Sequence, residues 1–366
     1  MASKEACRTR RQRRELGGWL ALCVGWSMAA AETLPPKPPP KPPLGGLLYM
    51  GDIRFNRQDG GIPALGLDEV AAAGDVFDGL VVNLTWAQLQ PDPERLDTAA
   101  LDAALAKIRQ FNAQHPNRRL ALRLRIWHGS GAPEWAKKLG GPPVAVRHRG
   151  VRVTVGRFWS GPYRSAWRRF QGRLGSRYDG ESLIRGVSNT SCSSITSEPF
   201  VFPADPESLK NLKEAGFNDD DFAKCLLDAA QDYAAWPTTR IDYAFNPYRT
   251  TGGGKVRHDL GFTLRVMKDW RATLGERGVL SNDSVQFPPP AFLQPIYDEM
   301  KRLGPPIELQ THSPKGLAWE ATVNYALSLG AGALELWGET AFGGYEDIAP
   351  ETLHRWSAQF KKNSGK

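Results

Sequence analysis

The sequence has little of what several common functional sites require. Only four of its 366 residues are cysteine and six are histidine, and the histidines do not follow the spacing of metal ligands. It has no Gly-x-Ser-x-Gly turn for a nucleophilic serine. The glycines at 252–254 lack the flanking strand and helix that a phosphate-binding loop needs. We therefore expect neither a metal nor a cofactor.

Excess charge of one sign is also small once the N-terminus is set aside. The formal net charge is +8, but residues 1–31 contain six basic and two acidic residues. The remaining 41 basic and 37 acidic residues leave only +4. A balance this mild does not indicate a nucleic-acid partner.

A hydrophobic run long enough to span a membrane is missing as well. Residues 16–28 are apolar but interrupted by glycine, follow five arginines, and precede three alanines at 29–31. This order is typical of a cleavable export signal. We predict a signal peptide over 1–31, a periplasmic or extracellular protein, and no stable membrane insertion after cleavage; an uncleaved anchor is the alternative.

Two compositional segments follow the signal. Residues 32–44 form a linker rich in proline and lysine, a composition that favours polyproline II and predicts a spacer. Residues 45–366 have the length of one barrel domain. With 41% hydrophobic residues and 12 tryptophans in the whole chain, this domain can bury a large core.

The domain alternates short apolar runs with helical patterns. This alternation predicts an α/β fold with a parallel sheet, and the count matches a single (β/α)8 TIM barrel. Functional groups of such a barrel lie at the C-terminal ends of its strands. A β-hairpin is predicted over 144–155, and the eight strands over 47–53, 80–84, 120–127, 183–187, 241–245, 278–283, 306–311 and 333–337.

Residues 163–202 join an amphipathic helix to the fourth strand and a hydroxyl-rich loop that ends at Glu198. A tryptophan-bearing helix, an Arg-Tyr-Asp turn and a strand ending in Ser188-Asn189 resemble the fourth-strand region of clan A glycoside hydrolases, especially the β-galactosidase-like members. In that family Asn-Glu ends the strand, and the Glu is the general acid/base. Because Thr190 follows Asn189 here, the resemblance implies this role for Glu198 only if the loop folds back over the barrel mouth.

The same family places its nucleophilic Glu at the end of strand seven, where this sequence has Gln310 or Thr311. Hydrolysis of a glycoside normally needs two carboxyl groups. The other candidates for the second one are Glu308, Glu335 and Glu339. Glu308 and Glu335 have an alternative role as buried ion-pair partners of arginines on strand three, which point into the barrel by their parity.

Aromatic residues follow strands two to four. The stretch from His128 to Trp135 resembles the third-strand loop of clan A enzymes. Trp337, at the end of strand eight, is a second resemblance, because members of that family commonly have a tryptophan there. Large aromatic faces stack well on sugar rings. Taken singly, Trp86, Trp127, Trp135 and Trp159 are better explained by packing, whereas the cluster favours a sugar platform.

The sequence therefore predicts an exported glycoside hydrolase-like barrel that acts on a carbohydrate. The alternative is a degenerate barrel that binds glycan without cutting it, and a lyase or isomerase on the same fold is a third hypothesis. The residues expected to bind substrate are Asp52, Arg54, Trp86, Arg125, Trp127, His128, Trp135, Asn189, Asn246, Tyr248, Asn282, Gln310, His312 and Trp337.

Two cysteines, Cys192 and Cys225, remain once the signal is removed. In an oxidising compartment they can form one disulfide, which would add roughly 3 kcal/mol to stability and restrain the loop of Glu198. An unpaired buried thiol at Cys225 is the alternative.

Overall fold

The computed structural model describes residues 38–51, 58–59, 62–74, 76–117, 119–252, 256–312, 317–337 and 345–365. The chain from Pro38 onward forms one compact unit. None of the helices in these ranges combines the length and apolarity needed to cross a membrane.

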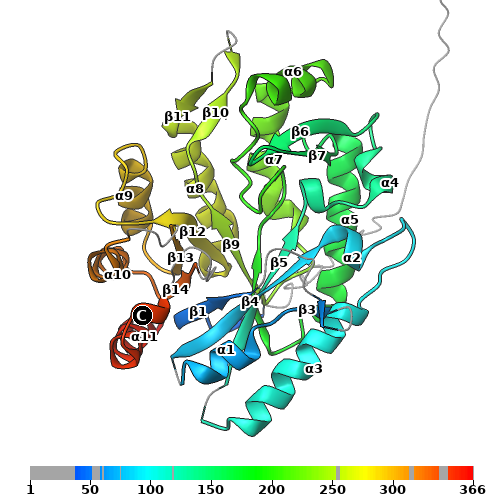
Figure 1. The fold of residues 1–366 in the computed structure, drawn as a ribbon. Coiled ribbons are helices and arrows are strands. Elements are labelled where there is room, and N and C mark those ends of the chain that lie inside the picture. Colours follow the sequence, from blue (N-terminus) through cyan, green and yellow to red (C-terminus); the bar gives the residue numbers. More distant parts are fainter. Residues whose placement is uncertain are drawn as a thin grey trace, which may run out of the picture. The chain divides into compact units, whose positions relative to one another are not determined.

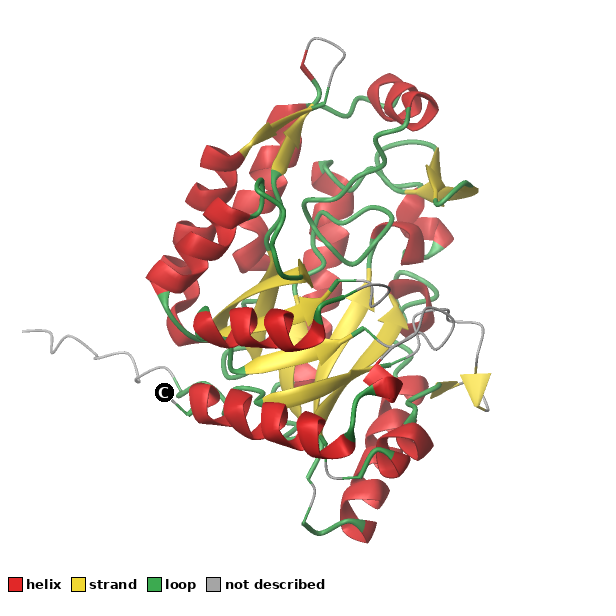
Figure 2. Ribbon diagram, turned by 60° about the vertical axis from the view of Figure 1, so that its left-hand side comes forward, coloured by secondary structure: helices red, strands yellow, loops and turns green. Residues whose placement is uncertain are grey.

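Eight parallel strands close into a barrel at the centre of this unit, with helices outside it (Figures 1 and 2). Each strand pairs with the next one of the barrel, and the last pairs with the first. The predicted (β/α)8 barrel is confirmed, and so is each of the eight strand positions. In order around the barrel the strands are β1 (Gly46–Met50), β4 (Phe77–Thr85), β5 (Ala121–Trp127), β8 (Ile184–Ser188), β9 (Arg240–Ala244), β12 (Gly278–Val285), β13 (Ile307–Thr311) and β14 (Ala333–Leu336).

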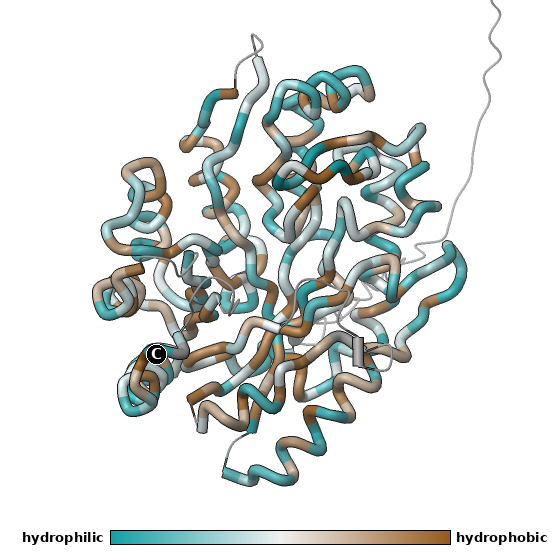
Figure 3. Tube along the Cα trace, viewed as in Figure 1, coloured by the Kyte–Doolittle hydropathy of each residue, from teal (hydrophilic) through white to brown (hydrophobic). Residues whose placement is uncertain are grey.

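The outer helices each bury one apolar face. In α5 (Gly161–Tyr178) Trp167, Phe170 and Leu174 are buried. The exposed side of the same helix carries Arg168, Arg169, Arg173 and Arg177. Hydrophobic and hydrophilic positions alternate along these helices (Figure 3), as amphipathic helices on a barrel require. The others are α1 (Leu67–Ala72), α2 (Trp86–Leu89), α3 (Ala99–Gln114), α4 (Glu134–Lys137), α6 (Pro206–Glu214), α7 (Asp219–Asp232), α8 (Leu260–Leu274), α9 (Gln294–Leu303), α10 (Trp319–Ser328) and α11 (Pro350–Ser364).

Short hairpins extend the loops of the barrel. The predicted hairpin is formed by β6 (Val144–His148) and β7 (Val151–Val155), and positive φ angles of 49° at Arg149 and 82° at Gly150 make its turn. A second hairpin, β10 (Tyr248–Thr250) with β11 (Arg257–Asp259), follows β9. Both hairpins and α6 lie at the same end of the barrel (Figure 1). A third, small pair joins β2 (Gln58–Asp59) and β3 (Ile62–Pro63).

Part of the predicted linker is fixed to the barrel. Lys41 donates three hydrogen bonds of 2.8 Å from Nζ, to the carbonyls of Glu181 and Ile184 and to Thr239 Oγ1. Its own carbonyl accepts from Arg240 Nε at 2.7 Å. The side chain of Leu44 is buried in a small apolar cluster with Leu48, Ala121 and Ala333. The compact unit thus begins at Pro38, within residues 32–44.

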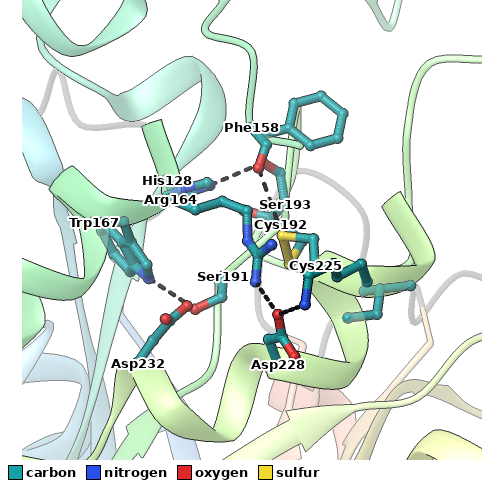
Figure 4. Close-up of a disulfide and its surroundings, with 12 residues drawn as sticks. His128, Phe158, Arg164, Trp167, Ser191, Cys192, Ser193, Cys225, Asp228 and Asp232 are labelled. Carbon is teal, nitrogen blue, oxygen red and sulfur yellow. Dashed lines mark hydrogen bonds and ion pairs between the residues drawn. A yellow bond between two sulfur atoms is a disulfide. The ribbon is translucent and has the colours of Figure 1, made fainter. Parts of the chain in front are cut away.

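The disulfide between Cys192 and Cys225 is formed, with an S–S distance of 2.05 Å and a Cα–Cα distance of 5.9 Å. It joins the loop after β8 to α7, beside Arg164 and Asp228 (Figure 4). Cys225 is therefore bonded to Cys192 and is not the unpaired buried thiol of the alternative.

Candidate active site

Two arginines of β5 point into the barrel, as their parity predicts, and meet carboxylates from three other strands. Arg123 Nε lies 3.3 Å from Asp242 Oδ1, its Nη1 lies 3.1 Å from Glu335 Oε2, and its Nη2 pairs with Glu308. Arg125 binds both oxygens of Glu335, at 2.9 and 2.6 Å. The barrel therefore encloses a network of ion pairs. Such a network is expected, because a buried charge needs a partner of opposite sign.

Glu308 and Glu335 are both buried members of this ion-pair network. Their exposed fractions are 3% and 0%, and both oxygens of Glu335 contact guanidinium groups. A carboxylate engaged in this way is not free to attack a sugar. The contacts favour the ion-pair alternative for both residues.

A different carboxyl group lies at the C-terminal end of β12. Asp283 is half-buried, and its buried Oδ1 has no hydrogen-bond partner among the described residues. Burial raises the pKa of Asp283 to about 7; Arg125 opposes this shift, and the negative charge of Glu198 adds to it. Our sequence analysis missed Asp283. Its signal was its position directly after Asn282, at the polar end of the sixth strand.

Glu198 occupies the mouth of the barrel because the loop after β8 folds back across it. Thr190 Oγ1 donates to the carbonyl of Ile126 at 2.6 Å, and the amide of Ser130 donates to the carbonyl of Ser194 at 2.7 Å. Gly129 permits this approach, since its φ is 50° and a Cβ there would lie 2.0 Å from Ser194 O. The condition that the family resemblance placed on Glu198 is therefore met.

The Glu198 carboxylate is half-buried and accepts a hydrogen bond of 2.8 Å from Asn246 Nδ2. Burial raises its pKa, while Asn246, Arg125 and Arg249 act in the opposite direction. Since the charge of Glu198 also shifts the pKa of Asp283, the two carboxyl groups interact across the barrel mouth. Two such groups with separate environments are the arrangement that acid/base chemistry uses.

Several residues expected to bind substrate are instead buried in an aromatic cluster. Trp86 has an exposed fraction of 0% and packs against His128, Trp135 and Trp167. His128 contacts Ser193 O through Nδ1 at 3.0 Å, and burial lowers its pKa to about 4. These contacts correct the expectation for Trp86 and His128, which belong to the core.

Trp159 and Tyr248 belong to the core in the same way. Trp159 is 4% exposed and packs edge-on against Phe158 and Phe217. Tyr248 is 3% exposed and donates to Asp219 O at 2.5 Å. Trp135 is half-buried, with its indole N–H bonded to the carbonyl of Gln90 at 3.2 Å. Of the four tryptophans predicted to form a sugar platform, Trp86 and Trp159 are therefore core residues, and Trp127 and Trp135 are half-buried.

Other predicted residues do lie at strand ends. Trp127 and Trp337 are half-buried at the ends of β5 and β14. Asn189, after β8, is 2% exposed, and its Nδ2 has no partner in the described part of the chain. Gln310 is buried in β13, and His312 beyond it is exposed. Their contact with a substrate remains a prediction.

Asp52, Arg54 and Glu339 lie outside the described residues, so their predicted roles stay predictions. Across the described ranges no group of three or more His, Cys, Asp or Glu side chains could hold a metal ion.

No family model and no curated protein matches the sequence. Among solved structures, endo-glycoceramidase II from Rhodococcus sp. in its ganglioside GM3 complex aligns at a TM-score of 0.56 with 14% identity, covering 88% of this chain and 81% of that one. A protein described as a glycoside hydrolase aligns at 0.51 with 12% identity, covering 86% and 99%. A triply substituted endo-β-1,4-glucanase from Xanthomonas axonopodis pv. citri aligns at 0.51 with 11% identity and the same coverage.

The chain has the barrel fold of these glycoside hydrolases. The resemblance to clan A is confirmed for the fold. Identities of 11–14% show a shared fold and do not show a shared function.

Proposed function

We propose that this protein hydrolyses a glycosidic bond with Glu198 and Asp283 as its two carboxyl groups. The observation that carries the proposal is their placement: Glu198 follows β8, Asp283 lies near the end of β12, and the charge of Glu198 acts on Asp283 and raises its pKa. A pair of carboxyl groups, one protonated and one ionised, is what glycoside hydrolysis requires.

The proton belongs on Asp283. Its Oδ1 receives no hydrogen bond from the described residues, and a pKa of about 7 leaves it largely protonated in mildly acidic solution. Glu198 accepts from Asn246, which stabilises a carboxylate. Asp283 then protonates the leaving oxygen, and Glu198 acts on the anomeric carbon directly or through a water molecule. This reverses the general-acid role that the sequence suggested for Glu198.

The neighbouring groups support such a reaction. Arg125 lies close enough to lower the pKa of both carboxyl groups, and its charge can stabilise Glu198 as an anion. Asn189 Nδ2, near the barrel mouth, has no hydrogen-bond partner among the described residues, and the half-buried Trp127 and Trp337 offer aromatic surface. A structural neighbour was solved with a ganglioside, so a glycolipid belongs among the substrates to be tried.

The test is a panel of aryl glycosides, oligosaccharides and one glycolipid, assayed with the wild-type protein, Glu198→Gln and Asp283→Asn. On substrates whose leaving oxygen must be protonated, each variant should lose at least about 100-fold in kcat while binding is kept. The exposed residues Glu207 and Asp269 provide matched controls, Glu207→Gln and Asp269→Asn, which should keep full activity.

Full activity of either active-site variant would remove that residue from the mechanism. A wild-type protein that binds glycan but turns over no member of the panel would favour the non-hydrolysing alternative. Detection of the protein in the periplasm or medium of its host, starting near Glu32, would support the export that we propose with this function.

A further inference from the structure

A chain of three polar side chains runs from α9 to Glu198. Tyr297 donates from its hydroxyl to Asn282 Oδ1 at 2.7 Å. Asn282 Nδ2 in turn lies 3.4 Å from Asn246 Oδ1, and Asn246 Nδ2 donates to Glu198 Oε1 at 2.8 Å. Tyr297 and Asn282 have exposed fractions of 0%, so water does not compete for their hydrogen bonds.

Two backbone groups determine which way the Asn282 amide faces. The Ser284 N–H, which can only donate, points at Oδ1 at a distance of 3.0 Å. The Phe245 carbonyl, which can only accept, receives Nδ2 at 2.8 Å. An amide turned by 180° would oppose donor to donor and acceptor to acceptor. The orientation of Asn282 follows from chemistry alone.

This orientation carries over to the next amide. Because Asn282 presents an N–H group to Asn246, the oxygen of Asn246 faces Asn282 and its Nδ2 faces Glu198. The backbone carbonyl of Asn246 accepts a separate hydrogen bond of 3.0 Å from Thr263 Oγ1, which fixes the main chain at this residue. Glu198 Oε1 therefore accepts this hydrogen bond, and an N–H donor stabilises the ionised carboxylate more than the neutral acid.

We propose that Tyr297, Asn282 and Asn246 are positioning residues that orient Glu198 and hold it in the ionised form. Hydrogen bonds in such a chain polarise one another, so each donor strengthens the next. The catalytic consequence rests on the function proposed above, but the effect on the Glu198 carboxylate does not. Tyr297 acts only through the amides.

The other charges that face Glu198 come from separate elements. They are Arg125 on β5, Arg249 on β10 and Asp283 on β12. A Tyr297→Phe substitution changes none of them and keeps the buried ring. Tyr325 on α10 provides a matched control, because its ring packs edge-on against Tyr297 at 5.6 Å and its hydroxyl is no member of the chain.

The experiment is a carbon-13 NMR titration of the Glu198 carboxyl group in full-length protein labelled at glutamate, with the resonance assigned by Glu198→Gln. Loss of a donor to the charged form raises a carboxyl pKa. Asn246→Ala should raise the pKa of Glu198 by about one unit, Tyr297→Phe by a few tenths, and Tyr325→Phe should leave it unchanged.

An unchanged Glu198 titration in Asn246→Ala or Tyr297→Phe, or an equal shift in Tyr325→Phe, would overturn the proposal. Because the titration needs no turnover, its result is independent of the glycosidase assay. The expected shifts in a protein that cleaves no glycoside would sustain the positioning chain and refute only the proposed function.

Discussion

Arg125 and Glu335 form a two-point ion pair inside the barrel, with Nη1–Oε1 and Nη2–Oε2 distances of 2.9 and 2.6 Å. Both side chains are at least 96% buried. The pair connects the structural ion network to the active site, because Arg125 also acts on the pKa of Asp283 and of Glu198.

Arg125→Met should therefore destabilise the fold strongly. Among the described residues it leaves Glu335 with its 3.1 Å contact to Arg123 as the remaining ion pair, and removing one partner of a buried pair costs about 3–5 kcal/mol. Urea unfolding measures the loss. The control is Arg147→Met, which breaks a pair whose side chains are 48% and 51% exposed and should cost less than about 1 kcal/mol. Equal losses in the two variants would contradict the ion-pair role.

The Cys192–Cys225 bridge should contribute to stability through the loop it closes. For a sequence separation of 33 residues, the double variant Cys192→Ser/Cys225→Ser is expected to lose about 3–4 kcal/mol. Thermal unfolding with and without a reductant measures this: the reductant should lower the Tm of the wild-type protein and leave that of the double variant unchanged. Two titratable thiols in unreduced protein beginning at Glu32 would contradict the bridge.

Lys41 should matter although it lies in a low-complexity segment. Lys41→Met keeps the aliphatic stem but leaves the acceptors on Glu181, Ile184 and Thr239 without their donor. The expected cost is about 1–3 kcal/mol in urea unfolding. Lys210→Met, at a side chain that is 72% exposed, is the control and should change stability little. If both variants unfold alike, the contacts of Lys41 do not stabilise the barrel.

The raised pKa of Asp283 predicts a pH dependence of stability. In the unfolded chain this carboxyl titrates near the ordinary aspartate value of about 3.9, and in the folded protein at about 7. Over the interval between these values the folded state binds more protons, so stability falls as pH rises. Asp283→Asn removes this penalty.

Its Tm relative to that of the wild-type protein should therefore increase from about pH 4 to 7 and level off above. Asp269→Asn, at an exposed side chain of α8, is the control and should show no such trend. A constant difference between Asp283→Asn and wild type across this range would refute the perturbed pKa.

The barrel could be predicted from the sequence because each strand is a short apolar run between helical patterns, and the predicted strand positions all agree with the structure. The arginines of β5 were also placed correctly, since parity alone sets the face of a strand residue. The docking of Lys41 could not be predicted in this way. Its acceptors are the carbonyls of Glu181 and Ile184 and the hydroxyl of Thr239, all far along the chain.

The site was predicted only in part. Glu198 was found through the family resemblance, but Asp283 was missed because that resemblance directed attention to strand seven. Its raised pKa arises from groups that only the folded chain brings together. Trp86 was misplaced because its helix turns it inward: Thr85 and Gln88 form a capping box that begins α2 at Trp86.

The most direct measurement of the carboxyl pair is the dependence of the rate on the leaving group. For a sugar that the wild-type protein accepts, kcat/KM is compared for the 2,4-dinitrophenyl and the phenyl glycoside in wild type, Asp283→Asn and Glu198→Gln. If Asp283 is the acid, Asp283→Asn should lose about 100-fold or more on the phenyl glycoside and far less on the dinitrophenyl glycoside, which needs no protonation. Glu198→Gln should lose both activities. Equal losses on the two substrates in Asp283→Asn, or an active Glu198→Gln, would contradict the assignment.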